Sequence, residues 1–456
     1  MSDLLKDTIF ALATPRGFGG VAVIRVSGPH ALDGLYALSD IQAEQNRFRY
    51  AQLCILKRLV SRETLDHALV LTFKAPHSYT GEDVVEYHVH GGIAVVDGAL
   101  AELALLPGHR MAEPGEFTRR AFENGKMDLT EAEAVADLIH AETTLQKQQA
   151  LLQMEGALGR VVGGWREALT RIVAYVEAEM EFPDEDLFID VQDEIRPQIL
   201  DLSAQMDSYL NDNRRGERLR NGIHIAVIGA PNAGKSSLVN ALAQRNVAIV
   251  SDLAGTTRDV VDVHLDIGGY PVILSDTAGL RPDQIGDDAH SQIESEGIRR
   301  ALDIAERADI RIVLYDATTG APDVHSYAIE KKYKHTLAVV NKIDTAVCFD
   351  HPTEVLSLSV HNNTGFDHFL EALVSVIEAF MSNNDGKHES PIITRQRHRD
   401  ALVDCRHSLE RSLSAAMPEL IAEDLRLALR HLGRITGRVD VENLLDVVFR
   451  DFCIGK

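Results

Sequence analysis

The sequence predicts a multidomain α/β protein, in which a phosphate-binding α/β module is inserted into an all-helical domain and preceded by an α+β N-terminal domain. Two observations lead to this prediction. A Gly-rich turn starting at Gly229 joins an apolar run to a helical segment, and helical patterns of apolar residues stand on both sides of the module that this turn opens. Because insertion is tolerated where chain ends lie close together, the two helical blocks can form one domain. The expected domains are residues 1–125, 126–216, 217–386 and 387–456.

Composition narrows the class of protein. The 456 residues are 45% apolar and 25% charged, which is ordinary for a soluble globular protein. No stretch approaches the length of a membrane span, and no basic region followed by an apolar run opens the chain, so we expect a cytoplasmic protein without membrane contact. The net charge of -23 argues against general adhesion to nucleic acid, so any RNA contact must be local. The cysteines Cys54, Cys348, Cys405 and Cys453 lack the spacing of a zinc site or a disulfide framework.

The N-terminal region reads as a small sheet covered by helices. Strands are predicted for the apolar runs 8–13, 21–26, 68–73 and 84–90, which Gly and Pro residues separate. Taken alone, the region shows no catalytic spacing. Arg25, Glu86 and His90 would then lie on a solvated strand face.

Helical periodicity begins at Asp128. Residues 130–133, Thr-Glu-Ala-Glu, fit a capping box at a helix start. Four glycines interrupt the pattern before the acidic loop 183–186 and predict at least two helices there: Gly156, Gly159, Gly163 and Gly164. A further helix is expected from about Ile195 to Arg215. After a linker at 382–387, helical periodicity resumes from Thr394 to the end of the chain.

The segment 229–236, Gly-Ala-Pro-Asn-Ala-Gly-Lys-Ser, has the pattern of a phosphate-binding loop. Gly229 and Gly234 permit close approaches that a Cβ would block, so backbone N–H groups can surround a polyphosphate. Lys235 adds a positive charge near the β- and γ-phosphates, and the Ser236 hydroxyl can bind Mg²⁺. The N-terminus of the following helix contributes its positive dipole end.

Further motifs follow in the order expected of a Ras-like P-loop GTPase domain. Apolar runs at 260–265 and 270–274 predict an antiparallel hairpin around Gly268 and Gly269. Asp276-Thr277-Ala278-Gly279 then places Asp276 to hold Mg²⁺ through water and the Gly279 N–H to meet the γ-phosphate. Thr257 is expected to supply a second hydroxyl to Mg²⁺. Both loops are therefore expected to be switches.

Asn341-Lys342-Ile343-Asp344 follows a predicted strand and indicates guanine. The Asp344 carboxylate can accept hydrogen bonds from N1 and N2 of guanine, which adenine cannot offer, and a mismatch would cost about 1–3 kcal/mol. Leu358-Ser359-Val360 is a weaker signal for a backbone contact to guanine O6. Four motifs in this order predict a GTP-binding domain.

The hydrolytic residue is not evident from the motifs. Leu280 stands where Ras-like proteins carry the glutamine that orients water, and an apolar side chain cannot polarise water. The acids available in the next segment are Asp283, Asp287, Asp288, Glu294 and Glu296.

Stretches along the whole chain resemble the MnmE (TrmE) family, GTPases of tRNA wobble-uridine modification. The resemblance is carried by Asp7-Thr8-Ile9, by 13–17 (Ala-Thr-Pro-Arg-Gly), by 79–84 (Tyr-Thr-Gly-Glu-Asp-Val), by 114–122 and by the terminal Phe452-Cys453-Ile454-Gly455-Lys456. It implies a homodimer, a flavoprotein partner MnmG in a heterotetramer, and addition of a carboxymethylaminomethyl or aminomethyl group at C5 of the wobble uridine of certain tRNAs. It also implies an N-terminal domain similar to folate-binding aminomethyltransferase-like folds, which binds 5-formyl-tetrahydrofolate or a related tetrahydrofolate through Arg25, Glu86, Lys126 and Lys456.

The resemblance also implies hydrolysis that depends on K⁺ and on pairing of GTPase domains. The implied K⁺ ligands are the Asn232 side chain, the carbonyls of Ser251 and Leu253, and Thr256. Glu294 is implied as the residue that positions water beside the catalytic Lys235, with Glu296 as the alternative because the segment 282–292 is longer than in the family. The residues expected around GTP are Asn232, Ala233, Gly234, Lys235, Ser236, Ser237, Ser251, Thr256, Thr257, Asp276, Thr277, Ala278, Gly279, Asn341, Lys342, Asp344 and Ser359.

Some interpretations stay open. Arg426, Arg430, Arg434 and Arg438 recur every fourth residue and would form one helical stripe, either a solvated face paired with acids such as Glu423 and Asp440 or a contact to tRNA. Cys453 is either chemically active or simply packed. An Era- or Der-type ribosome-assembly GTPase would need an RNA-binding appendage, and no G-x-x-G loop in a basic context follows Met381. Leu280 also allows a nucleotide-gated scaffold without turnover.

Overall fold

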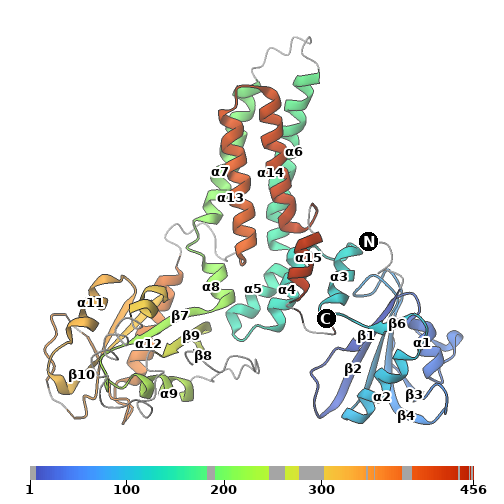
Figure 1. Ribbon diagram of the computed structural model, residues 1–456, viewed down its shortest axis with the longest axis horizontal. Helices are drawn as coiled ribbons and strands as arrows, with labels where there is room; N and C mark the ends of the chain where they lie inside the picture. Colours follow the sequence, from blue (N-terminus) through green and yellow to red (C-terminus); the bar gives the residue numbers. More distant parts are fainter. Residues whose placement is uncertain are drawn as a thin grey trace, which may run out of the picture. The chain divides into compact units, whose positions relative to one another are not determined.

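The computed structural model describes residues 7–181, 191–245, 262–276, 302–345, 348–353, 355–382, 393–439, 442–450, 452 and 455. Contacts divide the chain into two compact units. Unit 1 comprises Met1–Ala136, Gln153–Met180 and Met417–Lys456, and unit 2 comprises Asp137–Leu152 and Glu181–Ala416. The helical segments are shared between both units, so the four predicted domain boundaries stay a prediction. Figure 1 labels the elements of each unit.

Unit 1 contains a six-stranded sheet in the order β3-β4-β5-β2-β1-β6. Its strands are β1 (Thr8–Leu12), β2 (Gly19–Ser27), β3 (Gln52–Lys57), β4 (Thr64–Phe73), β5 (Val84–Gly91) and β6 (His109–Met111). Neighbours are antiparallel, except that β6 runs parallel to β1. The four predicted strands are confirmed, whereas β3 and β6 were not predicted.

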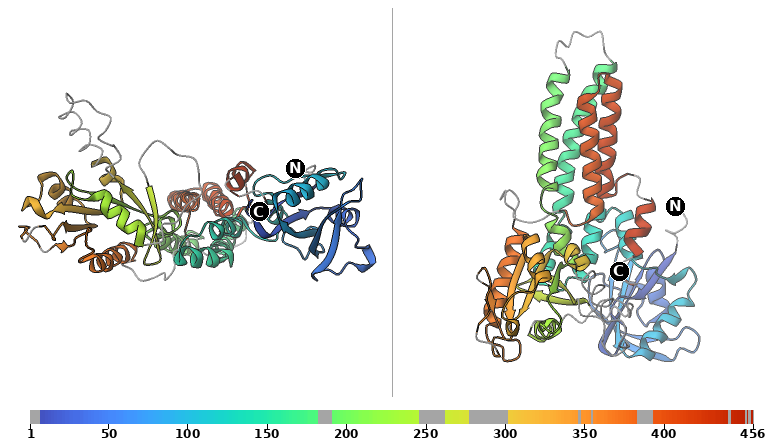
Figure 2. Two further views of the ribbon diagram at one scale, coloured as in Figure 1. Left: turned by 90° about the horizontal axis from the view of Figure 1, so that it is seen from below. Right: turned by 60° about the vertical axis from the view of Figure 1, so that its left-hand side comes forward.

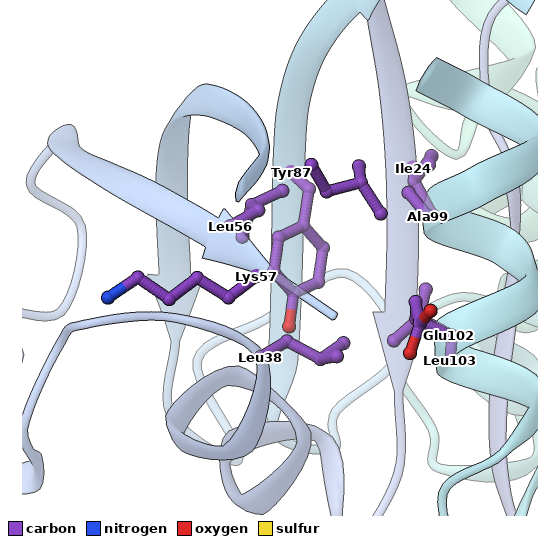
Figure 3. A pocket seen from close by; sticks show the side chains of 9 residues that line it. Ile24, Leu38, Leu56, Lys57, Tyr87, Ala99, Glu102 and Leu103 are labelled. Carbon is purple, nitrogen blue, oxygen red and sulfur yellow. The ribbon is translucent and has the colours of Figure 1, made fainter. Parts of the chain in front are cut away.

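One face of this sheet is covered by α1 (Ala31–Leu38) and α2 (Ile93–Ala104) (Figure 1). Alternate residues of the strands, such as Ile24, Val70 and Val85, pack there into one apolar core, as the two-residue period of a strand requires. A small apolar pocket between sheet and helices is lined by the Tyr87 ring (Figure 3). The buried Tyr87 hydroxyl has no hydrogen-bond partner among the described residues, and burial raises its pKa.

The remaining helices of unit 1 form two groups, one of which packs against α15 (Glu442–Arg450). An apolar cluster joins α4 (Leu129–Ile139) to α15, and α3 (Glu116–Glu123) also contacts α15. The long helices α6 (Ala157–Glu181) and α14 (Pro418–Thr436) lie side by side, and Glu177 pairs with Arg426 at 2.7 Å.

The predicted capping box is displaced. Asp128 caps α4, because its Oδ1 accepts the N–H groups of Thr130 and Glu131, while Glu131 Oε2 accepts the Asp128 N–H at 2.7 Å. The box therefore starts two residues before Thr130, with Asp in place of Thr. The predicted interruption at the glycines is only partly right. Gly156 separates α5 (Thr144–Met154) from α6, but Gly159, Gly163 and Gly164 lie inside α6.

An ionic network around the buried Arg120 joins the stretches 79–84 and 114–122. The Arg120 guanidinium lies between the carboxylates of Glu82 and Glu116, at 3.1 Å from each. Arg110 forms a bidentate pair with Glu116, at 2.8 and 2.6 Å. Because buried charges are tolerated only when paired and hydrogen-bonded, these residues constrain one another's identity.

Unit 2 contains a second six-stranded sheet, in the order β12-β11-β10-β7-β9-β8. Its strands are β7 (Ile223–Ile228), β8 (Asp262–Ile267), β9 (Tyr270–Asp276), β10 (Ile310–Asp316), β11 (Thr336–Asn341) and β12 (Leu356–Ser357). All neighbours are parallel except β8 and β9, which form the predicted hairpin. The helices α9 (Lys235–Arg245), α11 (Val324–Lys332) and α12 (Phe366–Met381) complete this α/β module.

The tip of the β8–β9 hairpin is held by two helices of the same unit. A Cβ added to Gly268 would lie 3.1 Å from Val374 of α12, and one added to Gly269 would lie 3.6 Å from Leu145 of α5. Along β8, His264 Nδ1 lies 3.5 Å from Glu142 Oε2. The hairpin is thus wedged between α5 and α12.

The helix predicted from about Ile195 to Arg215 is confirmed as α7 (Val191–Leu210), but it ends earlier than predicted. α7 ends before a turn, and α8 (Arg215–Asn221) begins after it. Asn213 and Arg214 adopt left-handed backbone angles, with φ of 54° and 55°, which no α-helix contains. α7 packs along α13 (Gln396–Ser414), and the views of Figures 1 and 2 agree on this. None of the described helices could span a bilayer.

Arg399 of α13 fixes this turn. Its Nε donates to Glu217 Oε1 at 2.6 Å, and its Nη atoms donate to Asp212 Oδ1 and the Leu210 carbonyl at 2.7 and 2.6 Å. Arg399, Asp212 and Glu217 are all buried. One guanidinium therefore neutralises two carboxylates and holds α7, α8 and α13 together.

We expect the substitution Arg399→Ala to lower the free energy of unfolding by about 3–5 kcal/mol, because it leaves buried carboxylates without a counter-charge. Arg426→Ala is the matched control: its ion pair with Glu177 is exposed, so we expect a loss of about 0–1 kcal/mol. Urea unfolding followed by circular dichroism measures both. Equal losses for the two variants would contradict the role of Arg399.

Candidate functional site

The ends of parallel strands bring four predicted motifs to one edge of the unit 2 sheet. In the strand register, Val227 of β7 stands opposite Asp276 of β9, and Asp316 of β10 stands opposite Asn341 of β11. β7 leads directly into the Gly-rich turn. Ligands of open α/β sheets bind outside the carboxyl ends of the strands, so this edge is the candidate nucleotide site.

The turn 229–234 depends on its two glycines. A Cβ on Gly229 would overlap the Leu314 carbonyl of β10, and a Cβ on Gly234 would overlap the Asn341 side chain. Gly234 also has φ of +99°, where side chains are strained, and Asn232 has φ of 64°. Both glycines are therefore required by close approach rather than by flexibility.

Lys235 and the serines after it stand where the turn enters α9. The Lys235 Nζ donates to the carbonyls of Gly229 and Ala230, at 2.9 and 3.0 Å, so the ammonium lies over the turn. Ser236 and Ser237 are exposed in the first turn of α9, and Ala233 is buried beneath it. The helix N-terminus and the ammonium give this turn a positive potential that suits phosphate.

Asn341 connects the phosphate side of the site to the base side. Its side-chain Nδ2 donates to the Ala233 carbonyl at 2.9 Å, and its Oδ1 accepts the Val360 N–H at 3.1 Å. The residue is buried. One side chain thus fixes the Gly-rich turn and the segment around Ser359 relative to each other.

The base side is built by two hydrogen-bonded pairs. A hydrogen bond from the Ser359 side chain lowers the pKa of Asp344, which is exposed while Ser359 is buried. The Lys342 ammonium lies 2.6 Å from Asp316 Oδ2. Burial raises the pKa of Asp316, but hydrogen bonds from Lys342 and Thr318 outweigh it and hold that pKa below its usual value. Both carboxylates therefore stay ionised, and that of Asp344 faces solvent, where a base can reach it.

Asp316 is a site residue that sequence reasoning missed. It caps the turn η4 (Ala317–Thr319) through the Thr318 N–H at 2.9 Å and positions Lys342, whose backbone has φ of 68°. Its only signal in the sequence is an acid at the end of an apolar run, which is common in α/β proteins.

Several predicted residues lie outside the described part of the chain. These are Ser251, Leu253, Thr256, Thr257, Thr277, Ala278, Gly279, Glu294, Glu296, Cys453 and Lys456. Of Asp276 the structure describes the backbone position at the end of β9, next to β7.

In unit 1, the structure pairs two of the residues expected to bind folate. Arg25 of β2 and Glu86 of β5 are cross-strand neighbours, and Arg25 Nε donates to Glu86 Oε1 at 2.9 Å. The guanidinium also lies 5.2 and 5.8 Å from the ring centres of Tyr79 and Phe117. Both partners are half-buried, so the interpretation of a solvated strand face is wrong for them.

Lys126 and the C-terminal lysine are also expected to bind folate. Lys126 Nζ donates to the Pro76 carbonyl at 3.0 Å, on the loop before Tyr79. The glycine before the terminal lysine, Gly455, has φ of +99°, and a Cβ there would overlap the Leu12 carbonyl of β1. Gly455 therefore lies against β1, the strand that pairs with the strand carrying Arg25.

The predicted arginine stripe is not continuous. α14 ends at Thr436, and Gly437 turns the backbone with φ of +79°, so Arg438 lies outside the helix. Arg426 pairs with Glu177 and, at 3.7 Å, with Glu423. The structure therefore favours a solvated, acid-paired surface at Arg426 over a free stripe.

We expect Gly234→Ala to weaken binding of a fluorescent GTP analogue by at least about tenfold, because the new Cβ strains the backbone and displaces Asn341. Gly164→Ala is the control: it lies in α6 with nothing within 4 Å of an added Cβ, and alanine favours a helix. Equilibrium titration measures both variants. Unchanged affinity of the Gly234 variant would show that the turn does not hold phosphate.

Comparisons with known proteins agree with this geometry. A family model described as the MnmE helical domain matches residues 129–453, and one described as the GTP-binding protein TrmE N-terminus matches residues 8–126. Among solved structures, Era of Aquifex aeolicus covers 43% of this chain and 69% of its own at 24% identity, with a TM-score of 0.26, which is too low to decide the fold.

Curated relatives match over the full length. Proteins named tRNA modification GTPase MnmE are 51% identical in Parvibaculum lavamentivorans, 48% in Paramagnetospirillum magneticum and 49% in Rhodospirillum rubrum. Each alignment covers 99% of this chain and 99–100% of the relative. The chain, whose phosphate turn, base loop and N-terminal sheet are described above, therefore belongs to the MnmE (TrmE) family of tRNA modification GTPases.

Proposed function

We propose that this protein hydrolyses GTP to GDP and phosphate and that it acts in tRNA modification. The observation that carries the proposal is the Asn341 side chain, which joins a phosphate-binding turn to a base-binding loop in one rigid site. The Asp344 carboxylate, ionised and exposed beside Ser359, suits the paired N–H donors of guanine. Family membership supports the same activity and its place in tRNA modification.

Mg²⁺ fits the phosphate side of this site. The exposed Ser236 hydroxyl at the start of α9, Thr257, and Asp276 at the end of β9 would hold the ion, since hard oxygen ligands are those that Mg²⁺ prefers. When bound, Mg²⁺ neutralises charge on the β- and γ-phosphates. Lys235, already placed over the turn by two carbonyls, would turn its ammonium toward the same phosphates.

K⁺ and an acid would complete the hydrolytic site in this proposal. Asn232 is exposed on the turn and has a left-handed backbone conformation. Its oxygen, the carbonyls of Ser251 and Leu253, and Thr256 would bind K⁺. Glu294 would orient the attacking water, with Glu296 as the alternative.

The open face of the N-terminal sheet supports the proposed homodimer. Leu53 of β3 and Leu69 of β4 stand opposite each other on the face that α1 and α2 leave uncovered, and they are 76% and 39% exposed. Val21 of β2 is 60% exposed. Exposed apolar side chains on a sheet face suit a self-complementary contact.

Folate binding is proposed for the Arg25–Glu86 pair in the same sheet. One oxygen of Glu86 is used by Arg25, and the other lies 3.8 Å from His88 Nε2, so a pterin N–H donor could share the carboxylate. Lys126 and the chain end, where Lys456 follows Gly455, would meet the anionic tail of the folate. The folate would supply the carbon that, with the flavoprotein partner MnmG, is added at C5 of the wobble uridine.

Two alternatives remain testable against this proposal. An Era- or Der-type role in ribosome assembly is disfavoured by the full-length match to MnmE relatives. A nucleotide-gated scaffold is suggested only by Leu280, and turnover measurements decide it.

We expect GTP turnover to be about tenfold or more faster in KCl than in NaCl, because a cation beside the β–γ bridge stabilises charge that grows in the transition state. Asn232→Ala should remove this difference, whereas Asn240→Ala, an exposed asparagine in α9, should retain it. Phosphate release at saturating GTP measures both. No turnover in KCl and none in NaCl would contradict the proposal that the protein is an enzyme. A K⁺ effect that persists in Asn232→Ala would contradict the assignment of Asn232 as a K⁺ ligand.

We expect tRNA from cells that lack this gene to lose the aminomethyl-type groups at C5 of the wobble uridine, because no other step installs them in this proposal. Liquid chromatography and mass spectrometry of tRNA nucleosides measure the loss, and the wild-type gene should restore the modified nucleosides. Unaltered wobble uridines in the deletion strain would contradict the proposed role.

A further inference from the structure

A surface loop between the turn η2 (Ala43–Gln45) and β3 alternates cations with aromatic rings. Its sequence is Arg47-Phe48-Arg49-Tyr50, and all four side chains are exposed. Tyr50 is 65% exposed and Phe48 is 38% exposed. We call these four residues the Arg-aromatic loop. Tyrosine and arginine are residue types enriched in the hot spots of binding surfaces.

The Arg-aromatic loop is held in one conformation by its backbone. Arg49 adopts a left-handed φ of 63°, and its N–H donates to the Thr72 carbonyl of β4 at 2.8 Å. The Arg47 N–H donates to Gln52 Oε1 at 2.8 Å, and Thr72 Oγ1 donates to Asn46 Oδ1 at 2.9 Å. The side chains are thus presented from a fixed turn, which lowers the entropy cost of binding.

The cations of this loop are not neutralised by the protein. Within the described ranges, Arg47 and Arg49 form no ion pair, and the Arg49 guanidinium donates at 3.2 Å to a neutral group, the His77 carbonyl. Elsewhere in unit 1, Arg58, Arg110 and Arg120 all lie against carboxylates. On a chain of net charge -23, this loop is a local positive site with ring faces beside it.

The loop adjoins the residues proposed to hold folate. Arg49 contacts the carbonyl of His77, and Lys126 contacts the carbonyl of the preceding residue, Pro76. Two residues further along, the Tyr79 ring lies against Arg25. A partner on the Arg-aromatic loop would therefore lie beside the proposed one-carbon donor.

We propose that the Arg-aromatic loop binds unpaired nucleotides of the tRNA substrate, with a base stacked on Tyr50 and phosphates beside Arg47 and Arg49. The inference rests on the proposed function and extends it to a named surface. Recognition of single-stranded RNA combines stacking on aromatic rings with arginine contacts to the backbone, and this loop offers both from one turn. An acidic protein partner would pair with the two arginines, but it would not need the exposed rings of Phe48 and Tyr50.

The test is equilibrium binding of a fluorescent anticodon stem-loop RNA to the full-length protein, at several KCl concentrations. Tyr50→Ala should weaken binding about tenfold through loss of stacking, and Tyr50→Phe, which retains the ring, should bind within about twofold of wild type. Arg47→Gln should weaken binding and lower the salt slope by about one unit. Arg171→Gln is the control, because Arg171 is an exposed arginine of the helix α6, where Glu167 lies 4.0 Å from it.

The expected result is a loss of affinity in Tyr50→Ala and Arg47→Gln together with unchanged binding in Tyr50→Phe and Arg171→Gln. No binding by the wild-type protein, or equal affinity of all variants, would overturn the proposal. Thermal unfolding of each variant separates lost contact from lost folding. The outcome is distinct from failure of the proposed function, because wobble-nucleoside analysis of the deletion strain tests that function without reference to this loop.

Discussion

The nucleotide site depends on one side chain that is itself outside the phosphate turn. Asn341 donates to the Ala233 carbonyl and accepts from Val360, so it occupies the space beside Gly234 and leaves no room there for a Cβ. The parallel register of β7, β10 and β11 brings the turn and the base loop to the same edge, but strands alone leave loops free to move apart. The buried Asn341 amide holds the turn and the base loop at a fixed spacing. Its burial costs little free energy, because both its nitrogen and its oxygen are hydrogen-bonded.

The sequence predicted those parts of the fold that depend on local chemistry. The β8–β9 hairpin follows from two apolar runs around Gly268 and Gly269, and the phosphate turn follows from its glycine spacing. The break between α7 and α8 was missed, because Asn213 and Arg214 adopt left-handed angles without the glycine that normally announces them. Asp316 was missed for a different reason: its partner Lys342 is 26 residues away and meets it only through the pairing of β10 with β11. Local patterns identify the motifs, whereas the contacts between motifs require the sheet.

The stretches of unit 1 that carry the family resemblance serve the fold as well as any ligand. Glu82 and Glu116 pair with the buried Arg120, and Gly115 has φ of +69° with Phe449 and Phe452 against it. These residues therefore tie the N-terminal sheet to the C-terminal helix α15. Arg25 and Glu86 pair with each other on the sheet face opposite to α1 and α2, where the Tyr79 and Phe117 rings lie against Arg25.

The wedged hairpin has a mechanical consequence. β8 begins and β9 ends next to the two segments expected to rearrange around the γ-phosphate, and β9 is registered on β7, whose end is fixed by the phosphate turn. Val374 lies near Gly268 and Leu145 lies near Gly269, so the far end of the hairpin packs between α12 and α5. A shift of one residue along β7 would drive the tip about 3.3 Å into α5 or away from it. The contacts of the hairpin tip with α5 and α12 therefore limit how far β8 and β9 can slide past β7.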